Sequence, residues 1–180
     1  LFFGPETSTA NRCMIGGMLG NNACGLHSLV YGSTRDHTLA VEGLLSDGSK
    51  ALFEDLSSDK INQKKDLQNL EGDIYRSLIK ILSDKSLQDE IVREYPDPGI
   101  PRRNTGYALD LLLKMQPFNA TGAPLNLVKL LGGSEGTLVF STKIKLNLIP
   151  LPPEHKAVLC AHFNDIQETL QANLVVLKNG

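Results

Sequence analysis

The sequence of 180 residues has no tryptophan and only three cysteines, which stand at positions 13, 24 and 160. An odd number of cysteines at irregular spacing does not form the paired framework of a small secreted domain. The first residues show no signal-peptide pattern either. We therefore expect reduced thiols and a cytoplasmic location.

Neither sign of charge dominates, because 18 Lys and Arg oppose 20 Asp and Glu and the formal net charge is -2. Proteins that bind nucleic acid through a basic field carry a surplus of Lys and Arg, so we expect no nucleic-acid partner. No apolar run approaches the ~20 residues that cross a bilayer, and we expect no membrane span. A hydrophobic share of 41% is ordinary for a folded soluble chain.

The first part of the chain predicts a loop followed by a β-hairpin. Gly4–Gly25 is too rich in Gly, Asn, Thr and Ser for one regular element, although it has room for a short helical turn. Leu39–Leu45 has the composition of a strand. Asp47 and Gly48 are a turn signal, and Ala51–Phe53 is the expected returning strand.

The middle of the chain carries most of the charge and predicts helices. Leucine and isoleucine recur at helical spacing over residues 67–82 and again over residues 87–95. Pro96 and Pro98 then end the second helix. The charges of this region balance, which favours a solvated helical surface over a site for a charged ligand. A further helical pattern covers Leu125–Leu131.

The last part begins with the clearest strand pattern. Apolar and polar residues alternate over residues 138–148, which predicts a strand with one buried and one solvent-facing side. Prolines cluster in residues 150–153 and predict a domain boundary. Beyond them, Val158–Phe163 is an expected strand. Asn164 and Gln167 form an expected capping box that opens a final helix.

The stretch Gly4–Gly25 also contains the residues best suited to hold a phosphate. Glycine lets main-chain amides approach a ligand because no Cβ atom intervenes, and successive N–H groups form concave anion sites. Hydroxyls and Asn carboxamides add further donors. The dinucleotide fingerprint GxGxxG is absent from the sequence. A nucleotide diphosphate site and a set of tight turns both remain open.

Two later loops contain candidate ligand contacts. In Leu131–Thr137 the paired glycines suit a helix C-cap and turn, while Glu135 could accept hydrogen bonds from main-chain amides or a ligand hydroxyl. Arg102 and Arg103 follow a proline-rich break. Two adjacent guanidinium groups can clamp a carboxylate or phosphate, and the alternative is ordinary surface charge.

Metal and thiol chemistry have little support in the sequence. Cys24 and His27 are close together and Cys13 lies upstream, but a zinc site needs a fourth ligand and usually a second close pair. The remaining candidates offer no such pair: His37, His155 and Cys160. A nucleophilic Cys24 lacks a third residue that would orient a His. We expect no metal, and small buried thiols instead.

Several of these motifs, in this order, resemble the FAD-binding domain of the vanillyl-alcohol oxidase / p-cresol methylhydroxylase superfamily. The matching motifs are Pro5–Ser8, Ile15–Gly17, Gly20–Gly25, Tyr31-Gly32, Asp47-Gly48 and Gly133–Leu138. Within these FAD-linked oxidases the chain is most similar to the D-lactate, glycolate and D-2-hydroxyglutarate dehydrogenase-like branch. Residues 102–110 resemble a segment of large members that fuse the flavin domain to an iron–sulfur part.

The resemblance implies an FAD site and assigns residues to it by position. FAD would lie against the loop Pro5–Gly25, the main chain of Val41 would meet its adenosine side, and Glu135 would lie in a late turn near it. The implied cofactor-binding residues are Pro5, Glu6, Thr7, Ser8, Ile15, Gly16, Gly17, Asn21, Asn22, Gly25, Tyr31, Gly32, Val41, Glu135 and Gly136. Arg102 and Arg103 are candidate contacts for an anionic substrate, and no catalytic residue is assigned.

The implied fold class is α+β: a second FAD-binding subdomain with a mainly antiparallel sheet flanked by helices, then the first strand and helix of a substrate (cap) domain. Residues 1–149 would form the FAD-binding part, with a helical insertion at about 54–131, and residues 150–180 would start the cap domain. The family's first FAD subdomain would precede this segment. The cap's His-rich motif and the iron–sulfur cysteines would follow it, so we expect a central fragment that is inactive alone.

The implied function is that of an FAD-dependent dehydrogenase. The complete protein would oxidise a 2-hydroxy acid by hydride transfer to flavin and pass electrons to iron–sulfur centres elsewhere in the protein. The expected partners are the substrate, an electron acceptor, which could place the protein at a membrane surface, and the remaining domains. Two alternatives stay open: a structural or interaction domain with the same sheet and no cofactor, and a flavin enzyme for another substrate class.

Overall fold

The computed structural model describes residues 1–100, 103–155 and 157–179. The chain divides into two compact units, Leu1–Pro150 and Leu151–Gly180. The division falls beside the cluster of prolines at residues 150–153. The assignment of residues 1–149 to an FAD-binding domain and of residues 150–180 to a cap domain stays a prediction.

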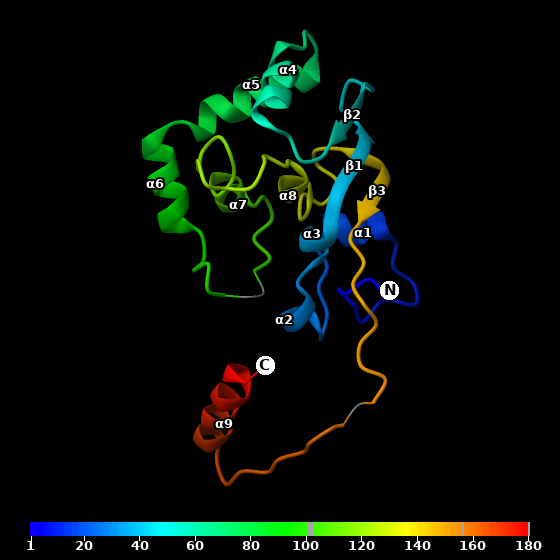
Figure 1. Cartoon of the computed structure of the whole chain (residues 1–180), viewed down its shortest axis with the longest axis vertical. Coiled ribbons are helices and arrows are strands. Elements are labelled where there is room, and N and C mark those ends of the chain that lie inside the picture. Colours follow the sequence, from blue (N-terminus) through cyan, green and yellow to red (C-terminus); the bar gives the residue numbers. More distant parts are fainter. Residues whose placement is uncertain (101–102, 156, 180) are drawn as a thin grey trace. The chain divides into compact units, whose positions relative to one another are not determined.

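An antiparallel sheet of three strands forms the centre of the first unit, within the residues that the structure describes. Strand β1 (Thr38–Leu44) lies between β2 (Lys50–Phe53) and β3 (Phe140–Leu146) (Figure 1). The predicted hairpin of β1 and β2 is confirmed. Its turn uses Gly48 at a φ of 81°, a left-handed conformation that glycine adopts without steric cost.

Strand β3 does not have the simple alternation that the sequence predicts. Glu42 pairs with Lys143 and Gly43 pairs with Ser141, so Thr142 is an extra residue in a β-bulge. An extra residue shifts the alternation of the strand by one, so side chains on the two sides of the bulge follow opposite alternation patterns. Ile144 therefore packs against the core together with Val139, whereas Phe140 is 72% exposed.

Helices fill the connection between β2 and β3. Three long helices come first: α4 (Ser58–Asp66), α5 (Leu70–Leu82) and α6 (Lys85–Glu94). The predicted helical periodicity is confirmed for α5 and α6. Asn69 begins α5 by accepting a hydrogen bond from the N–H of Gly72 (3.1 Å), and Asp84 caps α6 in the same way through Ser86 (2.9 Å).

Shorter helices then bring the chain back to the sheet. Helix α7 (Leu109–Leu113) contacts α8 (Val128–Leu131), and α8 contacts β1 (Figure 1). Of the helix expected over residues 125–131, only the last part, α8, is helical. Leu125 forms an antiparallel bridge with Leu56 instead, and an extended bridge is incompatible with helical dihedral angles.

The core lies between the sheet and these helices. Val41 on β1, Tyr75 on α5 and Leu112 on α7 are fully buried. Each large apolar side chain taken out of water contributes about 1.5–3 kcal/mol. This helical packing and the antiparallel sheet confirm the predicted α+β class.

The N-terminal part precedes the sheet and carries three short helices, α1 (Ile15–Gly20), α2 (Ser28–Tyr31) and α3 (Thr34–His37). Only α1 lies within the loop expected over residues 4–25, and it is the short helical turn for which that stretch had room. Helix α1 contacts both α3 and β3, which places the glycine-rich segment against the edge of the sheet.

The second unit contains helix α9 (Ile166–Lys178). The strand predicted over Val158–Phe163 is wrong: this segment is extended but makes no ladder in the part of the chain that the structure describes. Val158 and Leu159 are 90% and 91% exposed. A strand needs a hydrogen-bonded neighbour, which apolar composition alone cannot supply.

The expected cap of the final helix lies one residue further along the chain. Asp165, rather than Asn164, is the N-cap, and its side chain accepts a hydrogen bond from the N–H of Glu168 at 2.8 Å. Glu168 in turn accepts one from the N–H of Asn164 at 3.1 Å. In the part of the chain that the structure describes, no helix combines the length and apolar character needed to cross a membrane.

Candidate functional site

The segment Pro5–Ser8 packs directly against the second half of the glycine-rich loop. A Cβ atom on Gly25 would lie 1.4 Å from the carbonyl oxygen of Glu6, so only glycine permits this approach. The carboxylate of Glu6 lies 2.8 Å from Nδ1 of His27 across the same contact. Glu6, Thr7, Ser8 and Gly25 line a hollow of about 420 Å³ together with Cys24, Leu26 and His27.

Helix α1 presents two bare glycines to solvent. Met18 and Leu19 are buried and anchor the helix, while Gly16 and Gly17 are exposed. A Cβ atom on either glycine would meet nothing within 4 Å. The packing of this chain therefore does not require glycine at these two positions. The N–H groups of the first helical turn also have no acceptor within the helix, and the N-cap residue Met14 makes no side-chain hydrogen bond to them.

The late glycine turn lies against the end of α1. The N–H of Gly133 donates to the carbonyl oxygen of Leu19 (3.0 Å), and that of Glu135 donates to Gly20 (2.8 Å). Glu135 and Gly136 both have positive φ values, 52° and 76°. Two segments more than a hundred residues apart in the sequence thus meet.

A hollow of about 240 Å³ opens where these two segments meet. Gly16, Gly20 and Gly136 contribute main chain to its wall, and Ser134 contributes a polar side chain. The sequence had assigned the two glycine clusters to one site only through the family resemblance. The helix C-cap interpretation also holds, since the N–H of Gly132 donates to the carbonyl oxygen of Val128 at 2.9 Å.

Arg35 joins the glycine segments from behind. Its side chain is 4% exposed. Nε donates to the carbonyl oxygen of Gly132 at 3.0 Å and Nη2 donates to that of Gly106 at 2.6 Å. Nη2 also contacts the oxygen of Gly132 closely. No sequence pattern pointed to this residue, because a single Arg beside a turn is usually a solvent-exposed charge.

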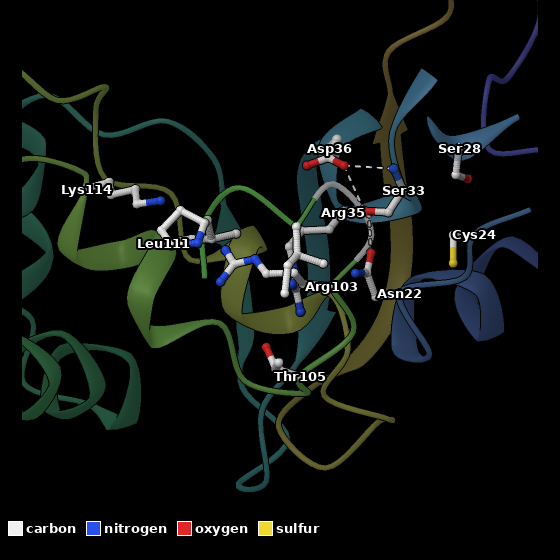
Figure 2. Close-up of a pocket in the computed structure, with 12 residues that line it drawn as sticks. Asn22, Cys24, Ser28, Ser33, Arg35, Asp36, Arg103, Thr105, Leu111 and Lys114 are labelled. Carbon is white, nitrogen blue, oxygen red and sulfur yellow. Dashed lines mark hydrogen bonds between the residues drawn. The ribbon is translucent and has the colours of Figure 1, made fainter. Parts of the chain in front are cut away.

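The main chain of Arg35 holds the first loop as well. Its N–H donates to Oδ1 of Asn22 at 2.9 Å (Figure 2). Asn22 is buried and has a φ of 47°. Burial lowers the pKa of Arg35, and the carboxylates of Asp36 and Asp110 partly offset that effect. A guanidinium group nevertheless stays charged at neutral pH.

Of the two arginines predicted to contact an anion, the structure describes one. Arg102 lies outside the described residues. Arg103 forms an ion pair with Asp110, with 2.6 Å between Nη2 and Oδ2, and donates to the carbonyl oxygen of Pro96 at 3.0 Å. Both partners of the pair are largely buried. The guanidinium group of Arg103 is thus engaged with the protein through Asp110, whose buried position no sequence pattern had indicated.

Arg103 also lines a third hollow behind the loop, of about 210 Å³. Figure 2 shows it with Asn22, Arg35 and Lys114 around this space. The surrounding charge is mainly positive, since Asp36 is the acidic residue among the described lining residues. Both guanidinium groups are nevertheless already engaged with the protein.

Three further predicted positions lie in or before the sheet. Tyr31 packs edge-on against Phe2, with 5.4 Å between ring centroids. Gly32 has a φ of 82°, which explains glycine there without a ligand. Val41 is fully buried in β1. Their proposed contacts with a cofactor stay predictions.

Within the described part of the chain, cysteines and histidines do not gather into a metal site. Among the described residues, no group of three or more His, Cys, Asp or Glu could hold a metal ion. The expectation of buried thiols is wrong, because Cys13 and Cys24 are half-buried and Cys160 is exposed. Cys13 donates weakly to the sulfur of Met18 at 3.4 Å.

Comparison with known proteins gives a consistent result. Residues 1–50 match the family described as FAD binding domain. The chain is 32% identical over 177 residues to a D-2-hydroxyglutarate dehydrogenase of Haemophilus influenzae. The matched region covers 95% of this chain and 16% of the relative. The corresponding enzymes of Pseudomonas putida and Escherichia coli are 34% and 33% identical over 84% and 87% of this chain.

The chain spans only 14% of the length of those two relatives and 16% of that of the first. No solved structure matches it significantly.

Proposed function

Because this chain belongs to the FAD-linked oxidase family, we propose that it builds part of the FAD site of an FAD-dependent oxidoreductase that oxidises a 2-hydroxy acid. The observation that carries the proposal is the meeting of two glycine segments. The end of α1 and the turn Gly133–Gly136 are hydrogen-bonded to each other and share one hollow.

The residues present fit a diphosphate group. Gly16 and Gly17 leave open space where a Cβ atom would otherwise stand. Without a Cβ atom in the way, the main chain of these glycines can approach an anion. Ser8 and Asn21 are exposed polar neighbours that can add hydrogen bonds. When bound, FAD supplies the hydride-accepting chemistry.

In this proposal the chain's own residues bind and orient the cofactor. Pro5–Ser8 and Gly25 form one wall, α1 forms a second and the turn at Glu135 forms a third. Val41 would contribute main-chain groups, because its side chain points into the core and is fully buried. No residue of this chain is assigned as a catalytic base.

The substrate class is proposed from the names of the relatives, which are D-2-hydroxyglutarate dehydrogenases. Arg102 and Arg103 remain the proposed contacts for its carboxylate. Arg103 would have to share its guanidinium group with Asp110, to which it is already paired. The transfer of electrons to iron–sulfur centres outside this chain rests on the resemblance of residues 102–110.

The decisive experiment uses the full-length protein. We expect it to purify yellow, or to acquire flavin absorbance on titration with FAD, and to reduce a dye acceptor with at least one member of a panel of D- and L-2-hydroxy acids. A protein that stays colourless with FAD would favour a structural or interaction domain. A yellow protein that oxidises none of the panel would support the FAD site and contradict the proposed substrate class.

Iron–sulfur centres are tested separately on the same sample. We expect iron and acid-labile sulfide, with an electron paramagnetic resonance signal that appears when substrate is added. A yellow and active protein without iron would remove this electron route and leave the FAD proposal intact.

A further inference from the structure

Arg35 stands where three separate segments of the first unit meet. It reaches Asn22 in the glycine-rich loop through its main chain, and Gly106 and Gly132 through its guanidinium group. Lys129 adds a fourth tie, because its Nζ donates to the carbonyl oxygen of Arg35 at 2.9 Å. A charged side chain that is 4% exposed would be unfavourable without such partners.

We propose that Arg35 is a positioning residue for FAD, which fixes the turn Gly132–Gly136 relative to the loop of Asn22. The inference rests on the proposed function. Arg35 itself touches no reacting atom. It acts through the main chain of the two segments that line the hollow.

The glycines around Arg35 support this assignment. A Cβ atom on Gly132 would lie 3.0 Å from Cβ of Arg35, and one on Gly133 would lie 2.7 Å from Nη2. Gly133 also has a φ of 87°. The turn is therefore shaped around the guanidinium group, and the paired glycines serve more than the helix C-cap.

The turn that Arg35 holds is also the turn that meets α1. Gly133 and Glu135 donate to the end of α1 through their N–H groups, and Gly136 lines the hollow with Gly16. If the carbonyl oxygen of Gly132 moved, the amides at residues 133–136 would move with it. Cofactor binding depends on such placement, because misplaced donors lose much of their interaction energy.

A planar fork is needed to hold two carbonyl oxygens at once. Arginine presents five donors in a fixed arrangement, whereas the ammonium group of lysine is a compact point charge on a flexible stem. Arg35→Lys would keep the charge and lose the simultaneous contact with Gly106 and Gly132. Arg35→Met would keep most of the length and lose both.

The test compares these variants with a matched arginine elsewhere. Arg76 on α5 also donates to a main-chain carbonyl, that of Leu67, at 2.8 Å, and α5 packs on α4 and α6. Arg76→Met therefore removes a similar structural tie away from the glycine segments. For each full-length protein, the dissociation constant for FAD, the visible circular dichroism of bound flavin and the unfolding temperature are measured.

We expect Arg35→Met to raise the dissociation constant at least about tenfold, equivalent to about 1.4 kcal/mol, and to change the dichroism of the flavin. Arg35→Lys is expected to lie between that variant and the unmodified protein. Arg76→Met is expected to lower the unfolding temperature and to leave both flavin readouts unchanged. Because Gly133→Ala disturbs the same contact, its effect should be less than additive with Arg35→Met.

Two results overturn the inference in different ways. If the unmodified protein binds FAD and both Arg35 variants bind it equally well with the same dichroism, Arg35 does not position the cofactor, while the proposed function stands. If the unmodified protein binds no FAD, both proposals fall. Should Arg35→Met not fold, Arg35→Lys and Gly133→Ala decide, and normal flavin readouts in those two variants count against the inference.

Discussion

The carbonyl oxygen of Glu6 occupies the place where a side chain on residue 25 would begin, because a Cβ atom on Gly25 would lie 1.4 Å from it. This contact joins the first residues of the predicted FAD loop to its last. It also means that packing alone requires glycine at this position. The hydrogen bond between Glu6 and His27 lies beside it.

Gly25→Ala is therefore expected to destabilise the protein by about 3 kcal/mol, since the overlap is with main-chain atoms that cannot move aside. The measurement is denaturant unfolding followed by circular dichroism. Gly99→Ala is the control, because its Cβ atom would meet only the flexible carboxylate of Asp97, at 3.2 Å. Equal stability of the two variants would contradict the packing of Pro5–Ser8 on Gly25.

Gly16 offers a test in which stability and cofactor affinity change in opposite directions. Glycine within a helix costs about 0.8–1.0 kcal/mol relative to alanine, and a Cβ atom at this position meets nothing within 4 Å. Gly16→Ala and Gly16→Leu should thus raise the unfolding temperature. Both should weaken FAD binding, the leucine more strongly, because they fill the proposed approach of the diphosphate.

The control for Gly16 is Asn62→Leu on the exposed side of α4, which should leave the affinity for FAD unchanged. Thermal unfolding and flavin fluorescence titration provide the two readouts. Unchanged affinity in Gly16→Leu would remove α1 from the proposed site.

The ion pair between Arg103 and Asp110 is buried enough to matter for folding. Removing one partner leaves an uncompensated charge, and Asp110→Ala should cost about 3 kcal/mol. The double variant Arg103→Met, Asp110→Leu should be more stable than Asp110→Ala, because it leaves no unpaired charge. Urea unfolding of the single and double variants measures the coupling.

An exposed pair supplies the comparison. Glu94 lies 2.8 Å from Arg93, and both side chains are about two-thirds exposed. Glu94→Ala should change stability by less than about 0.5 kcal/mol. If Asp110→Ala lowered the free energy of unfolding by as little as Glu94→Ala, the ion pair between Arg103 and Asp110 would be solvent-exposed rather than buried.

The bulge in β3 predicts unequal roles for two apolar residues that simple alternation would place together. Phe140 is 72% exposed, and Phe140→Ser in this chain should change stability by less than about 0.5 kcal/mol. Ile144 packs against the core, and Ile144→Ser should cost about 2 kcal/mol. Equal losses in chemical unfolding would mean that both share one buried face.

Local patterns in the sequence were sufficient for elements that form by local rules. The periodicity of α5 and α6 and the turn at Asp47 and Gly48 depend on neighbours within a few residues, and each is present. The strand expected over Val158–Phe163 is absent because a strand requires a partner that composition does not reveal. The alternation over residues 138–148 fails for a similar reason, since a bulge depends on pairing with β1.

The candidate site divides along the same line. Glycine-rich composition pointed to the stretch that contains Gly16 and Gly17, because glycine is where main chain comes close to other atoms, whereas Gly136 was assigned only through the family resemblance. Arg35 and Asp110 escaped notice, since an isolated charged residue has no pattern that distinguishes a buried role from a solvated one.

The amino-acid sequence by itself determined which elements could form and which residue types could hold a phosphate, because helix periodicity, turn chemistry and glycine's missing side chain are local properties. Tertiary structure alone decided that Leu19 and Gly20 meet Gly133 and Glu135, and that Arg35 lies buried behind them. These contacts join residues more than ninety positions apart, and such pairs are selected by the packing of the whole unit rather than by any neighbour in the chain.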